Sequence, residues 1–118
     1  MSSIFSTIGV AILAAIAITT AANLCTTVYL HRALSHRALS VRFPAAFIFR
    51  AIIWLTTGIK PKECVAVHRK HHAYTDVDGD PHSPVLLGWK KVQAKNVALY
   101  RATVLDPTTI DRYAKDLP

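Results

Sequence analysis

Five histidines at two spacings offer nitrogen ligands for a metal ion. His31 and His36 are five residues apart, whereas His68, His71 and His72 form an HxxHH group. If the second group is helical, steps of three and four residues place both later histidines on the side that the first occupies. The pattern predicts a metal-binding face. Imidazole suits iron, zinc and copper alike, so the spacing alone leaves the metal open.

The surroundings of these histidines do not fit the common zinc motifs. A zinc protease needs glutamate after the first histidine of HExxH, and Arg69 stands there. Zinc fingers need paired cysteines, but Cys25 and Cys64 have no zinc spacing. We interpret both cysteines as packing residues.

The first pair needs a special backbone to converge on one ion. Five residues correspond to about 140° around an α-helix. His31 and His36 therefore meet only if the helix ends or bends between them, and we expect it to end near His31 and Arg32. Pro44 then closes the segment, because the residue before proline is biased away from helix.

The stretch that precedes the first pair is apolar and uncharged over residues 4–30, long enough to cross a bilayer core of about 30 Å. A secretory signal peptide would begin with basic residues and have a shorter apolar run. A buried helix of a soluble protein is the other alternative, because threonines and Asn23 soften the hydrophobicity. We predict a transmembrane helix.

The remaining elements are shorter. Residues 45–59 are apolar around Arg50 and too short to span, which favours an interfacial helix. Residues 62–84 are expected to form a helix over 62–74, which carries the second histidine group, and then a loop. Residues 85–118 are expected to form a cytoplasmic segment. The predicted fold class is all-α and integral to the membrane, with one transmembrane helix and with interfacial and cytoplasmic helices that carry the histidines.

Charge is distributed unevenly along the chain. All 14 lysines and arginines follow His31, and the net charge is +7. The positive-inside rule then puts the N-terminus outside and the histidines on the cytoplasmic side of a membrane. A basic excess can also indicate nucleic acid, but no such motif is present, so we expect membrane lipid as the partner and no nucleic acid.

The two histidine groups closely resemble the histidine boxes of the membrane fatty acid desaturase family. His31-Arg-Ala-Leu-Ser-His36-Arg37 is similar to the first box and His68-Arg-Lys-His71-His72 to the second, and Asp80-Pro81-His82 and Gly88-Trp89 also match. Within this family, the sequence most resembles the bacterial acyl-CoA delta-9 desaturases. The resemblance implies two iron ions, O2 as co-substrate, desaturation of a fatty acyl chain held as acyl-CoA or acyl-lipid, and a bacterial inner membrane. The implied iron ligands are His31, His36, His68, His71 and His72.

Other polar residues near the boxes are secondary candidates. Acidic side chains can orient a ligand imidazole by accepting its free N–H. Basic side chains can meet the phosphates of an acyl-CoA head group. The candidates for the first role are His82, Asp80, Asp78, Asp76 and Glu63, and those for the second are Arg69, Lys70, Lys90 and Lys91.

The chain departs from the family pattern in one respect, because no histidine follows His82 and a third histidine box is absent. We therefore expect the N-terminal portion of a desaturase, inactive by itself. The alternatives are a fatty-acyl or alkane hydroxylase with the same boxes, and a non-catalytic, membrane-anchored metal-binding protein. The resemblance also implies a ferredoxin or cytochrome b5-type electron donor with its reductase.

Overall fold

The computed structural model describes residues 1–118 and contains helices but no strands. It divides into two compact units, residues 1–59 and 60–118. The expected all-α fold with one candidate membrane span is confirmed.

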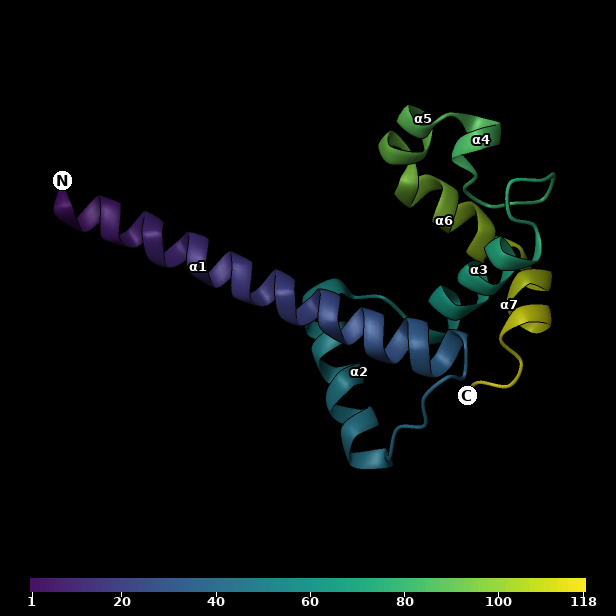
Figure 1. Cartoon of the computed structure of the whole chain (residues 1–118), viewed down its shortest axis with the longest axis horizontal. Coiled ribbons are helices and arrows are strands. Elements are labelled where there is room, and N and C mark those ends of the chain that lie inside the picture. The colour runs from purple at the N-terminus through teal and green to yellow at the C-terminus, as the bar shows by residue number, and fades with distance from the viewer. The chain divides into compact units, whose positions relative to one another are not determined.

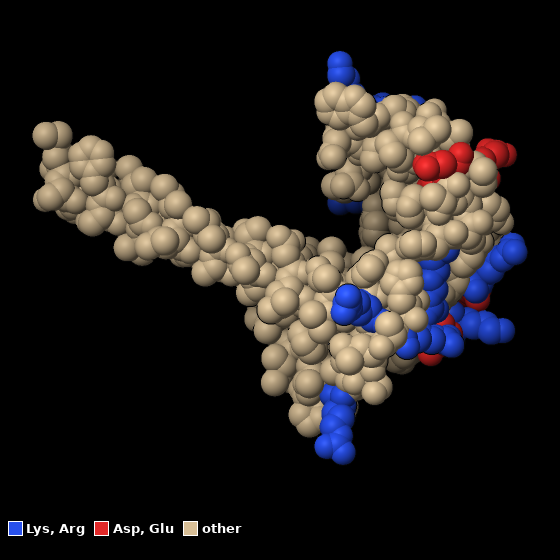
Figure 2. Space-filling view, in the orientation of Figure 1, with Lys and Arg blue, Asp and Glu red and all other residues tan.

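The first unit begins with the long helix α1, Ser2–Cys25, which continues without a break into a π-helix, η1, Thr26–Ser35 (Figure 1). Together they form the one single helix that is long and apolar enough to cross a membrane, with a mean hydropathy of 2.2 over its most apolar 18 residues. Figure 2 shows α1 as an uncharged rod. Its apolar side chains are exposed all around, as expected for a lipid-facing helix.

Helix α2, Phe43–Thr57, packs against α1 and η1 in the same unit. The rings of Tyr29 and Phe49 stack with centroids 5.5 Å apart. Pro44 does not close the preceding segment as expected; it lies in the first turn of α2, where its missing N–H costs no hydrogen bond. Gly58 ends the helix in the left-handed conformation, φ 66°, which glycine adopts without steric cost.

The second unit is built around α3, Pro61–Ala73, which carries the second histidine group. A loop leads to α4, Pro84–Leu87, then α5, Trp89–Ala94, α6, Asn96–Leu105, and α7, Pro107–Tyr113. Helices α6 and α7 pack on α3. Val65, Ala66 and Ala114 are fully enclosed at the centre of this unit, which fixes the histidine helix from behind.

Candidate functional site

The first histidine pair converges because the backbone is a π-helix. In this structure the amide of His36 bonds the carbonyl of His31 at 3.1 Å, a five-residue step. The Ser35 hydroxyl donates to the Leu30 carbonyl at 2.7 Å, again five residues back. The two Nε2 atoms of the pair are 3.2 Å apart.

The expectation that the helix ends near His31 and Arg32 is therefore wrong. The helix continues to Ser35, and its turn widens instead of breaking. An i→i+5 hydrogen bond brings residues five apart into line, as i→i+4 does for residues four apart. Such wide turns occur frequently at functional sites.

The second pair is formed by His68 and His72 on the regular helix α3. They are one turn apart, and their Nε2 atoms approach to 3.1 Å. Their rings meet edge to face, with centroids 4.6 Å apart. A π-helix and an α-helix thus produce the same local arrangement, in which two imidazole Nε2 atoms lie 3.2 Å and 3.1 Å apart, respectively.

His71 belongs to a separate cluster with Asp80 and His82. Its Nδ1 lies 2.8 Å from Asp80 Oδ1, and its ring stacks on His82 with centroids 4.4 Å apart. One ligand atom from each of these three residues lies within 4.8 Å of the others. Within the HxxHH group, His68 and His72 therefore pair with each other, whereas His71 contacts Asp80 of the loop that follows α3.

Asp80 is the centre of a hydrogen-bond network in that loop. Its side chain is 0% exposed. Besides His71, it accepts the amide of Asp76 at 2.9 Å and the amide of His82 at 3.1 Å. Burial acts to raise the pKa of Asp80, but the hydrogen bonds from His71, Asp76 and His82 outweigh it and lower the pKa. Asp80 is thereby kept as a carboxylate. Burial, followed by the charge of His71, lowers the pKa of His82.

Two further residues hold the loop in this shape. Ser83, fully buried, donates to Asp76 Oδ1 at 2.7 Å and accepts the Leu86 amide at 3.2 Å, which caps α4. Gly79 has φ +101°, and a Cβ there would lie 3.1 Å from the Tyr74 ring. The sequence analysis did not single out Ser83. The dipeptide Ser83-Pro84 is its signal, because serine at N-cap followed by proline at N1 starts a helix.

The donor atoms fit a first-row transition metal. Imidazole nitrogens bind zinc at about 2.0–2.1 Å, so two on one ion lie about 3 Å apart. The Nε2 separations of 3.2 and 3.1 Å match that spacing. A carboxylate on the other nitrogen of His71 is the partner that metal-bound histidines usually have. The five histidines, with Asp80 behind one of them, therefore offer nitrogen donors of the kind that iron, zinc and copper take.

The remaining candidates lie in other settings. Glu63 pairs with Lys60 at 3.4 Å in the first turn of α3. Asp78 is exposed in the loop. Lys90 lies over the Trp89 ring at 5.7 Å, and Lys91 is exposed on the same helix.

Arg69 and Lys70 attach α3 to α7 and the residues that follow it. Arg69 donates to the Tyr113 carbonyl at 2.8 Å and to Asp116 Oδ1 at 2.6 Å. Lys70 lies 3.2 Å from Thr109 Oγ1 and 3.6 Å from Asp106 Oδ2. Arg69 and Lys70 lie between His68 and His71 in the sequence, so the residues that anchor α3 and the histidines belong to the same turns of the helix.

Sequence reasoning also missed Tyr100 on α6. Its hydroxyl is buried with no hydrogen-bond partner. Burial raises the pKa of Tyr100, with smaller contributions from Cys64 and Glu63. Burial likewise raises the pKa of the half-buried Cys64 thiol. The raised pKa values keep both side chains neutral, Cys64 on α3 and Tyr100 on α6.

Comparisons with known proteins point to one family. The family model described as fatty acid desaturase matches residues 6–114. The chain is 39% identical over 67 residues to a delta-9 desaturase-like 2 protein of Arabidopsis thaliana, covering 57% of this chain and 22% of that protein.

Two relatives with other names also match. A hex-5-enoyl-[acyl-carrier protein] acetylenase of Moorena producens is 40% identical over 58 residues, which are 49% of this chain and 18% of the relative. An acyl-CoA C20 delta5-desaturase of Anemone leveillei is 36% identical over 64 residues, which are 54% of this chain and 20% of the relative. The chain thus spans about a fifth of the length of these relatives. No solved structure matches.

Proposed function

Because the chain belongs to the fatty acid desaturase family, we propose that the protein containing it uses O2 to remove two hydrogens from adjacent methylenes of a fatty acyl chain. The observation that carries the proposal is the pairing of histidine Nε2 atoms at 3.2 and 3.1 Å on two helices. An unactivated C–H bond has no acidic proton for a side chain to take, so a redox metal must supply this chemistry.

The proposed metal centre contains two iron ions. Iron with open coordination positions would supply the O2 activation that amino-acid side chains lack. Its proposed ligands in this chain are His31, His36, His68, His71 and His72. Neutral nitrogen ligands suit iron, and the family match supports that metal over zinc or copper.

Asp80 is proposed to position His71. A carboxylate that accepts from Nδ1 holds the ring proton there, which leaves the Nε2 lone pair available for a metal. The Asp76 and His82 amides hold the carboxylate in turn. His82 supports the same arrangement through its backbone and by stacking on the ring of His71.

The proposed substrate is a fatty acyl chain bound to a carrier. The names of the relatives specify different carriers: acyl-carrier protein, coenzyme A and, for a delta-9 desaturase of Arabidopsis thaliana, acyl-lipid. The acyl chain is what these substrates share, and acyl-CoA and acyl-lipid are the two proposed forms. Arg69 and Lys70 are committed to α7 in this structure, so Lys90 and Lys91 are the better candidates for contacts with a carrier phosphate.

An electron donor is required by the stoichiometry. Removing two hydrogens yields two electrons, whereas reducing O2 to two water molecules takes four. A ferredoxin or cytochrome b5-type protein with its reductase would supply the other two. We propose that residues 4–30 cross the membrane and that the histidines lie on the cytoplasmic side of a bacterial inner membrane, in agreement with the charge distribution.

To test the proposed desaturation, the complete reading frame that contains this sequence is expressed in a host with a known fatty acid profile. Gas chromatography with mass spectrometry of the acyl chains should reveal new double bonds. His72→Ala should abolish them, whereas Lys115→Gln, an exposed change away from the histidines, should not. Hydroxylated chains would indicate a hydroxylase instead. An unchanged profile, identical in the wild type and His72→Ala, would refute the enzyme assignment.

A further inference from the structure

Helices α4, α5 and α6 present a basic surface with exposed apolar side chains. The segment from Pro81 to Leu105 contains Lys90, Lys91, Lys95 and Arg101 and no acidic residue. Figure 2 shows blue side chains projecting at the α5 end of the second unit. This surface is therefore complementary to negative charge.

The same surface carries apolar side chains that no other part of the second unit covers. Trp89 is 66% exposed and Val85 is 71% exposed. Leu86 beside them is also exposed. Lys90 Nζ lies 5.7 Å from the centre of the Trp89 ring, so a cation and an aromatic ring sit together. Tryptophan with neighbouring lysines is the combination that settles at the boundary between head groups and acyl chains.

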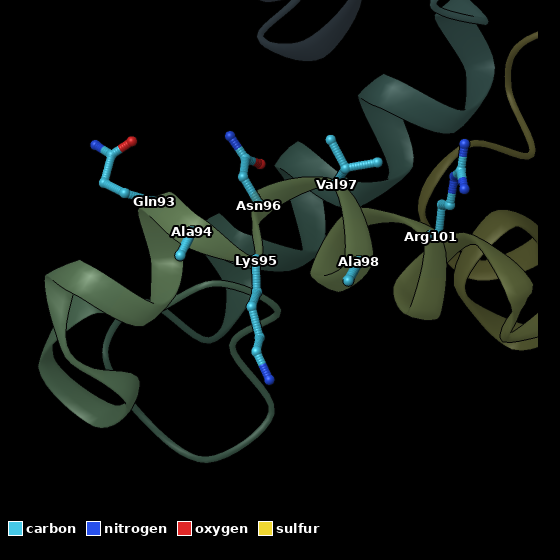
Figure 3. A pocket seen from close by; sticks show the side chains of 7 residues that line it. All are labelled: Gln93, Ala94, Lys95, Asn96, Val97, Ala98 and Arg101. Atoms are coloured by element: carbon cyan, nitrogen blue, oxygen red, sulfur yellow. The ribbon is translucent and has the colours of Figure 1, made fainter.

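A hollow of about 530 Å³ at the junction of α5 and α6 continues the basic surface (Figure 3). Lys95 and Arg101 are among its lining residues, and none of them is acidic. Figure 3 shows the two basic side chains leaving the backbone in opposite directions. They do not converge on a single anion, which favours attraction to many head groups over one tightly bound ligand.

We propose that the α4–α6 surface, defined by Val85, Leu86, Trp89, Lys90, Lys91, Lys95 and Arg101, docks on anionic lipid head groups. Trp89 and Leu86 enter the interface, and the lysines and Arg101 contact lipid phosphates. The attraction need not be strong, because α1 already ties the chain to a bilayer and a tethered surface binds at high effective concentration. This docking does not depend on the proposed enzymatic reaction.

The experiment uses Trp89 as the probe. The 118-residue chain carrying Trp54→Phe has one tryptophan, and it is placed in nanodiscs of phosphatidylcholine alone or with phosphatidylglycerol. In the anionic discs, Trp89 emission should shift to the blue, brominated lipids should quench it, and acrylamide should quench it less. Added salt should reverse these effects, because exposed charges are screened. This salt titration needs no charge variant.

The variant Lys90→Gln, Lys91→Gln should lose most of the difference between the two disc types. The control Arg112→Gln, Lys115→Gln removes the same charge from the other end of the unit and should keep it, with circular dichroism showing equal helix content. Docking is refuted if Trp89 stays open to acrylamide in both discs. It is also refuted if the blue shift is equal in both discs and indifferent to salt.

Discussion

At the scale of the residue, Asp80 decides which nitrogen of His71 carries the proton. It is enclosed, bonded by two backbone amides and the imidazole, and its lowered pKa keeps it charged. The sequence analysis found this acid among several, because Asp76, Asp78 and Asp80 alternate in one short run. Only the folded loop distinguishes them: Asp80 contacts the ring, Asp76 bonds Ser83, and Asp78 is exposed.

Replacing Asp80 by asparagine should weaken metal binding by about 10–100-fold, the usual effect of removing a carboxylate behind a ligating histidine. The measurement is a titration of the chain in detergent with Co2+, followed by visible absorption. Asp78→Asn, in the same loop, is the matched control and should bind as the wild type does. Equal affinities for all three proteins would mean that Asp80 does not position a ligand.

The hydrogen bonds of Asp106 should be detectable in a pH titration, because they lower the pKa of its carboxyl group. Bonds from the Thr108 hydroxyl and amide lower its pKa below the ordinary value of about 3.9. Its contribution to stability is therefore complete above about pH 4 and is lost as pH falls through the lowered pKa. The Thr108 amide resonance in NMR should titrate with a midpoint below 3.9, and Asp106→Asn should abolish that titration. A midpoint at or above the ordinary value would contradict the bonding.

At the scale of the element, contacts with α7 fix the orientation of α3 about its own axis. Buried Val65 and Ala66 come from the apolar pattern of α3, but the ion pairs of Arg69 and Lys70 join residues about forty positions apart. The sequence predicted a helix over residues 62–74, close to Pro61–Ala73. It did not predict these partners, since no local spacing relates them. Asp106 caps α7, a role that the sequence analysis did not predict.

Arg69→Ala should lower the free energy of unfolding of the second unit by about 1–3 kcal/mol, because it removes the charged donor that bonds Asp116 and the Tyr113 carbonyl. Hydrogen exchange at α7 amides measures the loss. Arg69→Asp with Asp116→Arg should recover the ion-pair share but not the bond to Tyr113. Arg112→Ala, an exposed arginine of α7, serves as the control. Unchanged exchange in Arg69→Ala would show that α7 does not depend on this anchor.

The π-helix is the element that sequence reasoning could not supply. Unlike the uniformly apolar α1, η1 mixes apolar residues with polar ones such as His31, Arg32 and Ser35, and such a mixture is found in α-helices as well as in π-helices. The five-residue spacing of His31 and His36 indicated that an ordinary helix would not suffice. The two histidines are brought together by a wider helical turn, whereas the sequence analysis expected the helix to end there.

At the scale of the whole molecule, one apolar helix that is long enough to cross a membrane precedes the histidine-bearing segments in the chain. The family and the all-helical class follow from short, local patterns and were therefore accessible from sequence. The interfacial position expected for residues 45–59 stays a prediction, because a membrane is not part of the structure. α2 does expose Phe43, Phe47, Trp54 and Leu55.

Opposite ends of the chain should lie on opposite sides of the membrane. In a background with Cys25→Ala and Cys64→Ala, single cysteines replace Ser3 or Lys115, both exposed. In intact cells an impermeant maleimide should label Ser3→Cys, whereas Lys115→Cys should need permeabilised cells. Labelling of both from outside, or of neither, would contradict the orientation that the positive charges predict.

The widened winding of η1 has a consequence for everything after it. Were this stretch to rewind by one residue into an ordinary α-helix, each later position would swing about 100° around the axis. His36 would leave His31, and the approach to α2 would turn with it. A metal ion held by both imidazoles would therefore also favour the π-helical winding, and its removal would allow the residues after η1 to rotate about the helix axis.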